Sequence, residues 1–493
     1  MLTSKIPFMA INERLIDTKV EAAGNGGGGT GNQEEGLILH LDANDVDSYD
    51  GDGAEWVDIT NHEYTPATNV SEHFNTVTFI GNGSTNSITG VGFQPDLVWL
   101  KHRSGGSPAA TNHYLYDSVR GITTKALFSN LTNAEVGVSN HITSSDIDGF
   151  TLGNDTAANA VNANYVAWCF KAGGAPSGSD KVSIDGTSYA TMAAAGLTDG
   201  TAPISKLSVN TKLGFSIVKY TFSSPSPSQT VAHGLSSAPE MIITKSTTST
   251  GNWYTYHKDV GKGKYLQLDS SAQAATYANG FSTVDATSWQ QYFRSDAQSY
   301  IAYCFASKRG VSKVGSFTGS GAAGNFQYCG FEPAFIMIKI TNISSSWFIW
   351  DNKRSPSNPR INILEADDNA AAYNSAGPNF LPTGFDFDSD SYNNSGFNFI
   401  YYAVAKDTNE TSLIPDTDLE LHLDAASFDG STNTPSTWTA LTGGNGTITG
   451  TTFDSELGNY LNIASDSDYV DVPTANMLDS DFTIEMWYNQ DDV

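Results

Sequence analysis

Three copies of one short pattern constrain the fold of this chain more than any other feature. Each copy begins with a proline, continues with mostly apolar residues and reaches a lysine six positions later; the copies are Pro95–Lys101, Pro239–Lys245 and Pro333–Lys339. A short apolar run between a proline and a charge is typical of a buried β-strand, because the first residue of a strand need not donate to the ladder. The sequence therefore predicts three equivalent buried strands.

A second landmark follows each of these strands about 60 to 70 residues later. The three aromatic segments are Tyr165–Phe170, Tyr300–Phe305 and Phe399–Val404. Two landmarks that recur in the same order indicate a threefold tandem repeat. Each copy would hold about six strands in roughly 85–100 residues, which is too many for a propeller blade and suits a small antiparallel sandwich.

The composition favours an all-β protein with many turns. Hydrophobic residues make up 39% of the chain and charged residues only 16%, while Gly, Ser, Thr, Asn and Asp, which supply turn conformations, fill much of the rest. The formal net charge of −28 argues against binding to nucleic acid or to an anionic membrane surface.

We predict an all-β fold of three tandem antiparallel β-sandwiches with a jelly-roll module. The expected segments are an N-terminal docking arm and Gly-rich tether at 1–35, jelly-roll-like opening strands at 36–73, sandwich repeat 1 at 74–173, an inserted linker with a short helix at 174–213, repeat 2 at 214–310, repeat 3 at 311–407 and an incomplete jelly roll at 408–493. The helix is expected at Tyr189–Ala195, ended by Gly196.

Two simple features bear on cellular location. The sequence has no apolar run of the roughly 20 residues that a membrane span needs, and its N-terminus lacks the continuous apolar core of a secretory signal. Cys169 and Cys304 occupy equivalent repeat positions, where the third copy has Ala403. This slot is predicted to be a small buried site, so we predict no structural disulfides. The lack of a secretory signal predicts assembly in a host cytoplasm.

Both ends of the chain resemble a laminin-G-like (concanavalin A-like) jelly roll. Leu37–Ala43 and Leu419–Ala425 share one pattern, and each is followed by a tryptophan 14 positions after its aspartate. Phe482–Tyr488 is similar to a core strand of that family and alternates apolar with polar residues. Such a domain needs on the order of 150 residues, so either the protein continues past Val493 or the sandwich is completed differently.

The repeat block also resembles a known family. Gly92–Lys101, Asp185–Asp199 and the aromatic ending Tyr165–Phe170 are similar to a domain of uncharacterised function that recurs in structural proteins of marine bacteriophages, often beside laminin-G-like modules. The resemblance covers about 330 residues and brings no catalytic residues. It implies a virion component, such as a tail fibre or a related appendage.

The residues that could carry catalysis do not form a recognisable motif. His40 and His422 lie inside apolar strand patterns, and His113, His233 and His257 fall near repeat loops without a matching acid or cysteine at motif spacing. Glu485 stands alone on its predicted strand, whereas jelly-roll glycosidases carry several acids on one strand face. We therefore predict that the chain is not an enzyme.

Metal binding rests on one aspartate cluster. Asp45, Asp47, Asp50 and Asp52 fall within eight residues of a glycine-containing segment, and calcium takes six to eight oxygen ligands from such loops. The cluster lacks the glutamate that closes an EF-hand loop, and solvated turn aspartates explain it equally well. The alternating acids Asp386, Asp388 and Asp390 fit one face of an exposed edge strand. We predict no other cofactor.

The combined interpretation is a structural and adhesive phage virion protein, most simply a tail fibre or appendage that spaces and presents receptor- or glycan-binding modules. The expected partners are other virion proteins, through residues 1–35, a host surface glycan, and further copies of the chain, as a trimer by analogy with fibre proteins. No nucleic acid and no membrane insertion are expected. The alternatives are a head or capsid decoration protein, and a secreted polysaccharide-active enzyme or bacterial adhesin.

Overall fold

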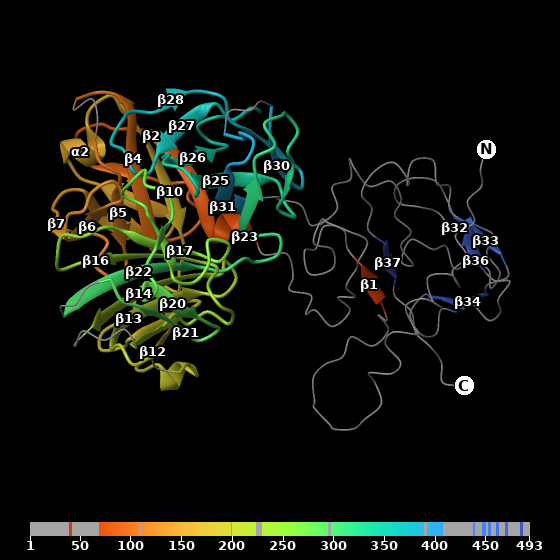
Figure 1. Cartoon of the computed structure of the whole chain (residues 1–493), viewed down its shortest axis with the longest axis horizontal. Coiled ribbons are helices and arrows are strands. Elements are labelled where there is room, and N and C mark those ends of the chain that lie inside the picture. The colour runs from red at the N-terminus through yellow and green to blue at the C-terminus, as the bar shows by residue number, and fades with distance from the viewer. Residues whose placement is uncertain are drawn as a thin grey trace. The chain divides into compact units, whose positions relative to one another are not determined.

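The computed structural model describes residues 69–107, 111–198, 200–222, 229–293, 297–388 and 392–407, together with the backbone of seven short strands outside that range (Figure 1). Nearly all regular structure is strand, and every strand pair in the described part of the chain is antiparallel except β11 with β13. The prediction of an all-β fold built from antiparallel sheets is confirmed. Within the described residues, no helix is long and apolar enough to cross a bilayer.

Repeat 1 pairs a six-stranded sheet with a three-stranded sheet. The large sheet has the order β2–β10–β4–β5–β6–β7 and the small sheet the order β3–β9–β8. The strands are β2 Phe74–Ile80, β3 Asn86–Ile88, β4 Leu97–Gly105, β5 Tyr114–Asp117, β6 Lys125–Phe128, β7 Val136–Gly137, β8 Ile142–Asp146, β9 Gly149–Leu152 and β10 Ala163–Phe170; η1 Val70–Glu72 and α2 Thr156–Asn159 are single turns.

Repeats 2 and 3 reproduce this arrangement. In repeat 2 the large sheet contains β14 Phe215–Phe222, β22 Gln298–Phe305, β16 Met241–Ser246, β17 Tyr254–His257, β18 Lys264–Gln267 and β19 Ala275–Thr276, and the small sheet β15 Thr230–Ala232, β21 Ser288–Gln291 and β20 Phe281–Val284. Repeat 3 has β23 Ser312–Thr318, β31 Asn398–Ala405, β25 Pro333–Ile340, β26 Trp347–Asp351, β27 Asn362–Glu365 and β28 Tyr373–Asn374, with β24 Gln327–Tyr328, β30 Gly384–Phe387 and β29 Pro378–Leu381.

The proline-led strands are buried strands, as predicted. They are β4, β16 and β25, and each lies next to the aromatic strand of its own repeat: β10, β22 or β31. The large sheets are covered on both faces, which explains why their central strands read as continuous apolar runs. Along β22, Tyr300, Ala302 and Cys304 belong to the sandwich core, whereas Ile301 and Tyr303 face a second core.

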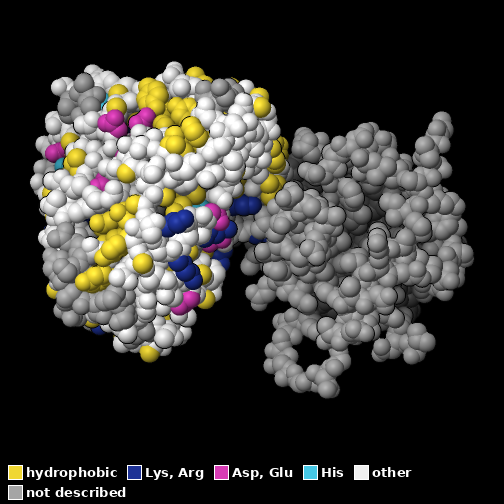
Figure 2. Space-filling model, in the orientation of Figure 1, with side chains coloured by type: hydrophobic (Ala, Val, Ile, Leu, Met, Phe, Trp, Pro, Cys, Tyr) yellow, Lys and Arg dark blue, Asp and Glu magenta, His cyan; other side chains and the backbone are white. Residues whose placement is uncertain are grey.

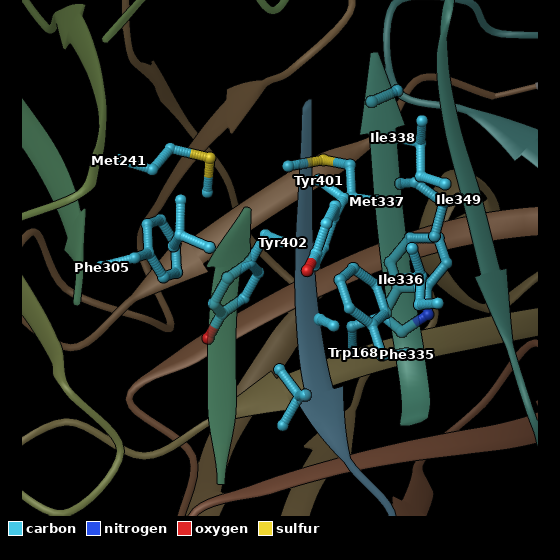
Figure 3. Close-up of a cluster of buried hydrophobic side chains, with 14 of the residues drawn as sticks. Trp168, Met241, Phe305, Phe335, Ile336, Met337, Ile338, Ile349, Tyr401 and Tyr402 are labelled. Carbon is cyan, nitrogen blue, oxygen red and sulfur yellow. The ribbon is translucent and has the colours of Figure 1, made fainter. Parts of the chain in front are cut away.

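This second core is shared by all three repeats. Trp168 from repeat 1, Phe305 from repeat 2, and Phe335 and Tyr402 from repeat 3 belong to one buried cluster (Figure 3). The ring centroids of Phe305 and Tyr402 are 4.7 Å apart, and those of Trp168 and Phe335 are 5.9 Å apart. The three repeats are therefore packed around one centre, and residues 65–409 form one compact unit.

The insertion at 174–213 extends the sheet of repeat 2, although the sequence indicated a linker with a short helix. Its strands β11 Val182–Ile184, β12 Thr187–Tyr189 and β13 Ile204–Asn210 continue the large sheet beyond β14. The expected helix is a single 3-10 turn, η2 Ala193–Ala195, which ends at Gly196 with a φ of 70°. The left-handed backbone at this glycine is the usual way to end a helical turn.

The second compact unit combines residues 1–64 with 410–493. Strand β1 (Leu39–Leu41), from the first jelly-roll-like opening, pairs antiparallel with β37 (Ile484–Met486) near the C-terminus. The remaining described strands of this unit form two small antiparallel sheets; they are β32 Thr437–Trp438, β33 Gly446–Thr449, β34 Thr452–Asp454, β35 Tyr460–Asn462 and β36 Tyr469–Asp471. The two ends of the sequence thus contribute strands to one sheet.

The repeated cysteine slot provides a stability test. Cys169 and Cys304 are free thiols with no exposed surface, and Ala403 fills the equivalent place in repeat 3. We expect Cys304→Ala to lower the free energy of unfolding by about 1 kcal/mol or less, and Ala403→Leu to lower it by about 1–3 kcal/mol, because a fully packed slot resists extra volume. Urea unfolding of both variants measures the difference, and an equal loss in both would contradict the small-slot interpretation.

Candidate functional site

The lysines that close the three proline-led strands form the most distinctive set of polar contacts in the described residues. Lys101, Lys245 and Lys339 lie on strands and have no exposed surface, although lysine side chains are usually exposed to solvent. Each ammonium reaches a backbone carbonyl of a neighbouring repeat, and the three contacts join Lys101 Nζ to Asn369 O (2.9 Å), Lys245 Nζ to Thr132 O (3.1 Å) and Lys339 Nζ to Ser271 O (3.0 Å). Repeat 1 thus binds repeat 3, repeat 2 binds repeat 1, and repeat 3 binds repeat 2.

Backbone hydrogen bonds close the same ring. The amides of Glu135, Ala274 and Ala372 occupy equivalent places and donate to the carbonyls of Thr247, Thr341 and Arg103 at 3.1, 2.8 and 2.9 Å. Each acceptor lies two residues after one of the three lysines. Three bonds of the same kind between successive copies, returning to the first copy, describe a closed cyclic arrangement like that of a symmetric trimer, here within one chain.

Aromatic donors add a third layer of contacts between repeats. Trp253 Nε1 of repeat 2 donates to Phe128 O of repeat 1 (2.7 Å), and Trp347 Nε1 of repeat 3 donates to Gln267 O of repeat 2 (2.9 Å). His113 stands at the same place in repeat 1, where its Nδ1 accepts from Trp99 Nε1 at 3.0 Å. These rings join apolar burial to a satisfied hydrogen bond, as buried tryptophans usually do.

Two buried ion pairs are each completed by a neighbouring repeat. Asp351 Oδ2 accepts from Arg354 Nε (2.5 Å) in its own repeat and from Trp168 Nε1 of repeat 1 (3.0 Å). Asp117 and Arg120 make the same pair in repeat 1. There, Asp117 Oδ2 also accepts a hydrogen bond from Tyr303 Oη of repeat 2 at 2.8 Å. Repeat 2 has His257 and Val260 at the equivalent places, so it lacks the third pair.

The buried lysines predict a pH dependence of stability. Burial lowers the pKa of Lys101 and of Lys339 from 10.5 to about 8, with Asp368 and Asp367 opposing the shift. Between pH 8 and 10.5 the unfolded chain therefore binds more protons than the folded chain, and stability rises with pH through this window. We expect a rise of about 1 kcal/mol per lysine between pH 8 and 9.

Urea unfolding at pH 7, 8 and 9 measures this effect as the difference between the parent and Lys101→Met or Lys339→Met. Because every cysteine and tyrosine is present in all three proteins, their own titration cancels in the difference. Each variant is expected to have a flatter profile than the parent. Parallel profiles would contradict the lowered lysine pKa values.

Three of the histidines that the sequence analysis singled out, His113, His233 and His257, are buried in the interior of the three-repeat unit. Burial lowers the pKa of His233 and of His257 to about 4 and that of His113 well below 6.5. The Nδ1 atoms of His233 and His257 accept backbone amides, from Leu235 at 3.1 Å and Asp259 at 3.2 Å. A buried neutral ring whose Nδ1 accepts a hydrogen bond from a neighbouring amide or indole is a packing element. His40 is the register partner of Glu485 in the β1–β37 pair.

The aspartates proposed to bind calcium, Asp45, Asp47, Asp50 and Asp52, lie outside the described residues. Of the alternating acids, Asp386 and Asp388 both accept from Asn379 Nδ2, at 2.8 and 2.6 Å, so this pair is organised by an amide. No group of three or more His, Cys, Asp or Glu side chains in the described residues is arranged to hold a metal ion.

The shared core contains a small cavity of about 20 Å³. It is lined by apolar side chains of all three repeats, including Leu97, Ile243 and Met337. A water molecule needs about 10–15 Å³ but also two to four polar partners, which this lining does not offer. The cavity is a packing defect at the centre of the ring, and it is too small for an organic ligand.

The exposed surface of the described body is polar and varied. Figure 2 shows basic side chains gathered in one region of the face in view, while hydrophobic side chains form several separate groups. The large exposed hydrophobic side chains in the described residues are dispersed along the sequence; they are Ile80, Ile147, Val161, Tyr277, Phe326, Ile361 and Tyr373. Single exposed apolar side chains are normal for a protein surface.

The inter-repeat contacts escaped the sequence analysis, although their signal is visible in it. The lysine six residues after each proline was interpreted as the charge that ends a strand, whereas it lies inside β4 and β25 and is buried. Its recurrence in all three copies was the available signal, because a buried charge needs a partner. The partner itself could not be read, since Asn369 is 268 residues away from Lys101.

Comparison with known proteins identifies a family whose model covers the three repeats and the insertion. A family model described as a domain of unknown function, DUF7483, matches residues 69–408. No curated protein matches the chain. The matched segment begins at the first described residue before η1 and ends just beyond β31, so it contains all three repeats and the insertion. Because the match covers more than half of the 493 residues, the chain belongs to the DUF7483 family.

Proposed function

We propose that this protein is a structural and adhesive component of a phage virion, most simply part of a tail fibre or appendage. The observation that carries the structural part is the closed ring of contacts among the three repeats. Buried lysines, backbone amides and aromatic donors join each repeat to the next, and the last returns to the first. Buried polar contacts of this kind favour a rigid body, as a spacer in a virion appendage would need to be.

The virion context is supported by the resemblance of the repeat block to phage structural proteins. Residues 1–35 would dock on another virion protein, and the jelly-roll-like segments would contact a host surface glycan. The homotrimer inferred by analogy with fibre proteins remains a prediction. Size-exclusion chromatography with light scattering on the purified chain measures it, and a monomer would remove the analogy.

Electron microscopy of intact particles tests the location. Density for the three-repeat body on a tail appendage, with residues 1–35 ordered against a neighbouring protein, would support the fibre proposal and give the copy number. Density distributed over the head lattice would favour a decoration protein. Absence of the chain from purified particles would contradict both, and an assay for polysaccharide cleavage by the purified protein would then test the secreted-enzyme alternative.

A further inference from the structure

A solvent-open groove lies between repeats 1 and 2, beside the Asp117–Arg120 pair. One wall is the turn 118–121 that follows β5. The floor is formed by three neighbouring strands, with Lys206 on β13, Lys219 and Thr221 on β14, and Ser299 on β22. Its volume of about 520 Å³ is within the range of small-ligand sites.

Two lysines face each other across the floor of this groove. Lys206 and Lys219 are direct register partners in the β13–β14 pair. Like charges placed opposite each other on antiparallel strands repel, so the arrangement costs stability without an anion between or above them. Lys206 Nζ donates to Pro176 O at 2.9 Å, which occupies one of its three donors, and no ion pair of Lys219 is found in the described residues.

A β-bulge adjusts the strand at this point. The register of β13 against β14 shifts between Ile204 and Lys206, which leaves Ser205 as the extra residue. Ser205 Oγ donates to Lys219 O at 3.0 Å, and Thr221 Oγ1 is 3.0 Å from Ser299 Oγ across the next pair. Bulges change the direction of side chains and are frequent beside functional sites. The lysines are therefore accompanied by hydroxyls, and no carboxylate lines the groove.

The other two repeats act as an internal control. The strand positions equivalent to Lys219 are Thr78 in repeat 1 and Ser316 in repeat 3, as the pairing with the aromatic strands shows. Both are uncharged, so the repeat fold does not require a lysine there. The opposed pair occurs where the insertion adds β13, which means that the insertion builds the groove.

The charge of the chain is distributed so that an anion can approach this body. Residues 69–407 contain 22 Lys and Arg against 24 Asp and Glu, a formal charge of −2 out of the total −28. The remaining segments hold the other 29 acidic residues and only three basic ones. A polyanion is thus repelled much less by the three-repeat body than by the rest of the chain.

We infer that this groove binds an anionic polysaccharide through its sulfate or carboxylate groups. The two ammonium groups would hold one or two anionic substituents, and the hydroxyls of Ser205, Thr221 and Ser299 would hydrogen-bond sugar hydroxyls. No aromatic side chain lines the groove, so stacking on a neutral sugar face does not contribute. The assignment deepens the adhesive part of the proposed function and rests on it only for the source of the glycan.

Binding of the purified full chain to immobilised dextran sulfate and alginate tests the inference, with uncharged dextran as the reference. We expect saturable binding to at least one polyanion at low ionic strength, loss of binding in about 1 M salt, and none to dextran. Lys206→Gln/Lys219→Gln is expected to weaken binding by about tenfold or more for each ammonium removed. Preference for dextran sulfate or for alginate identifies the anionic group.

The matched control is Lys181→Gln/Lys262→Gln, which removes the same charge from exposed positions outside the groove. It should bind like the parent, and equal weakening in both double variants would mean unspecific attraction and overturn the inference. If the groove variant fails to fold by circular dichroism, Lys219→Gln alone replaces it. Unchanged affinity in a folded groove variant, or no polyanion binding by the parent, would also overturn it. Neither result depends on where the chain lies in a particle.

Discussion

Replacing Asp351 with alanine should lower the free energy of unfolding by about 3–5 kcal/mol, the largest single-residue effect that we expect in this protein. The carboxylate of Asp351 accepts from the Arg354 guanidinium, from the backbone amide of Arg354 (2.8 Å) and from Trp168 Nε1 of repeat 1. Its loss leaves the buried Arg354 guanidinium without a counter-charge, and it removes the acceptor that the Trp168 indole Nε1 donates to. Urea unfolding followed by tryptophan fluorescence measures the effect.

The charge and the lost contacts can be separated with a second variant. Asp351→Leu/Arg354→Met removes both charges and retains apolar volume, so it should recover most of the loss seen in Asp351→Ala. Lys353→Ala, an exposed change in the same turn, should stay within about 0.5 kcal/mol of the parent. If the double variant is as unstable as Asp351→Ala, the unpaired guanidinium is not the cause.

A fragment that contains all three repeats should fold alone, whereas a fragment without repeat 3 should not. Residues 69–407 keep the shared core and every ring contact. Residues 69–310 lose Phe335, Met337 and Tyr402 from that core and the Asn369 carbonyl that receives Lys101. Lys101 would keep only its bond to Thr111 O (2.8 Å). The free energy lost by exposing so much apolar surface, together with the loss of this lysine's second carbonyl, is expected to exceed the typical stability of a domain, roughly 5–15 kcal/mol.

Circular dichroism and urea unfolding of the two fragments test this prediction. The longer fragment should unfold in one cooperative transition, and the shorter one should show no cooperative transition and should aggregate. Two independent folded sandwiches in residues 69–310 would instead mean that each sandwich core is sufficient and that the shared core only joins them. The same measurement decides whether the repeats act as separable modules or as one rigid body.

Much of the fold could be predicted because its signals are local. Alternation and apolar runs identified β4, β16 and β25 and their partners β10, β22 and β31, since a strand displays its buried faces with a period of two. The insertion was harder to interpret. Its strands β11 and β12 are three residues each, and such short segments carry too few residues for a period to appear. They are strands because β13 offers a sheet edge to β11, and β11 in turn offers one to β12.

The candidate sites, in contrast, depend on tertiary contacts that the sequence does not display. A list of histidines and acids by sequence could not distinguish a ligand from a packed ring. Burial decided the matter for His113, His233 and His257, together with a hydrogen bond from the Trp99 indole to the first and from backbone amides to the other two. The groove lysines were invisible for a similar reason. Lys206 and Lys219 become partners only through the register of two strands, and a shift of one residue would place them on opposite faces.

The sequence by itself determined that this protein is all-β, that it contains three copies of one sandwich, and which strands lie in the core. These properties follow from short-range patterns that each copy repeats. Only the tertiary structure decided that the copies close on one another, because the contacts that join them link residues as far apart as Lys101 and Asn369. The free energy of burying a lysine depends on a carbonyl supplied by another copy, and the sequence repeats the lysine without showing which carbonyl receives it.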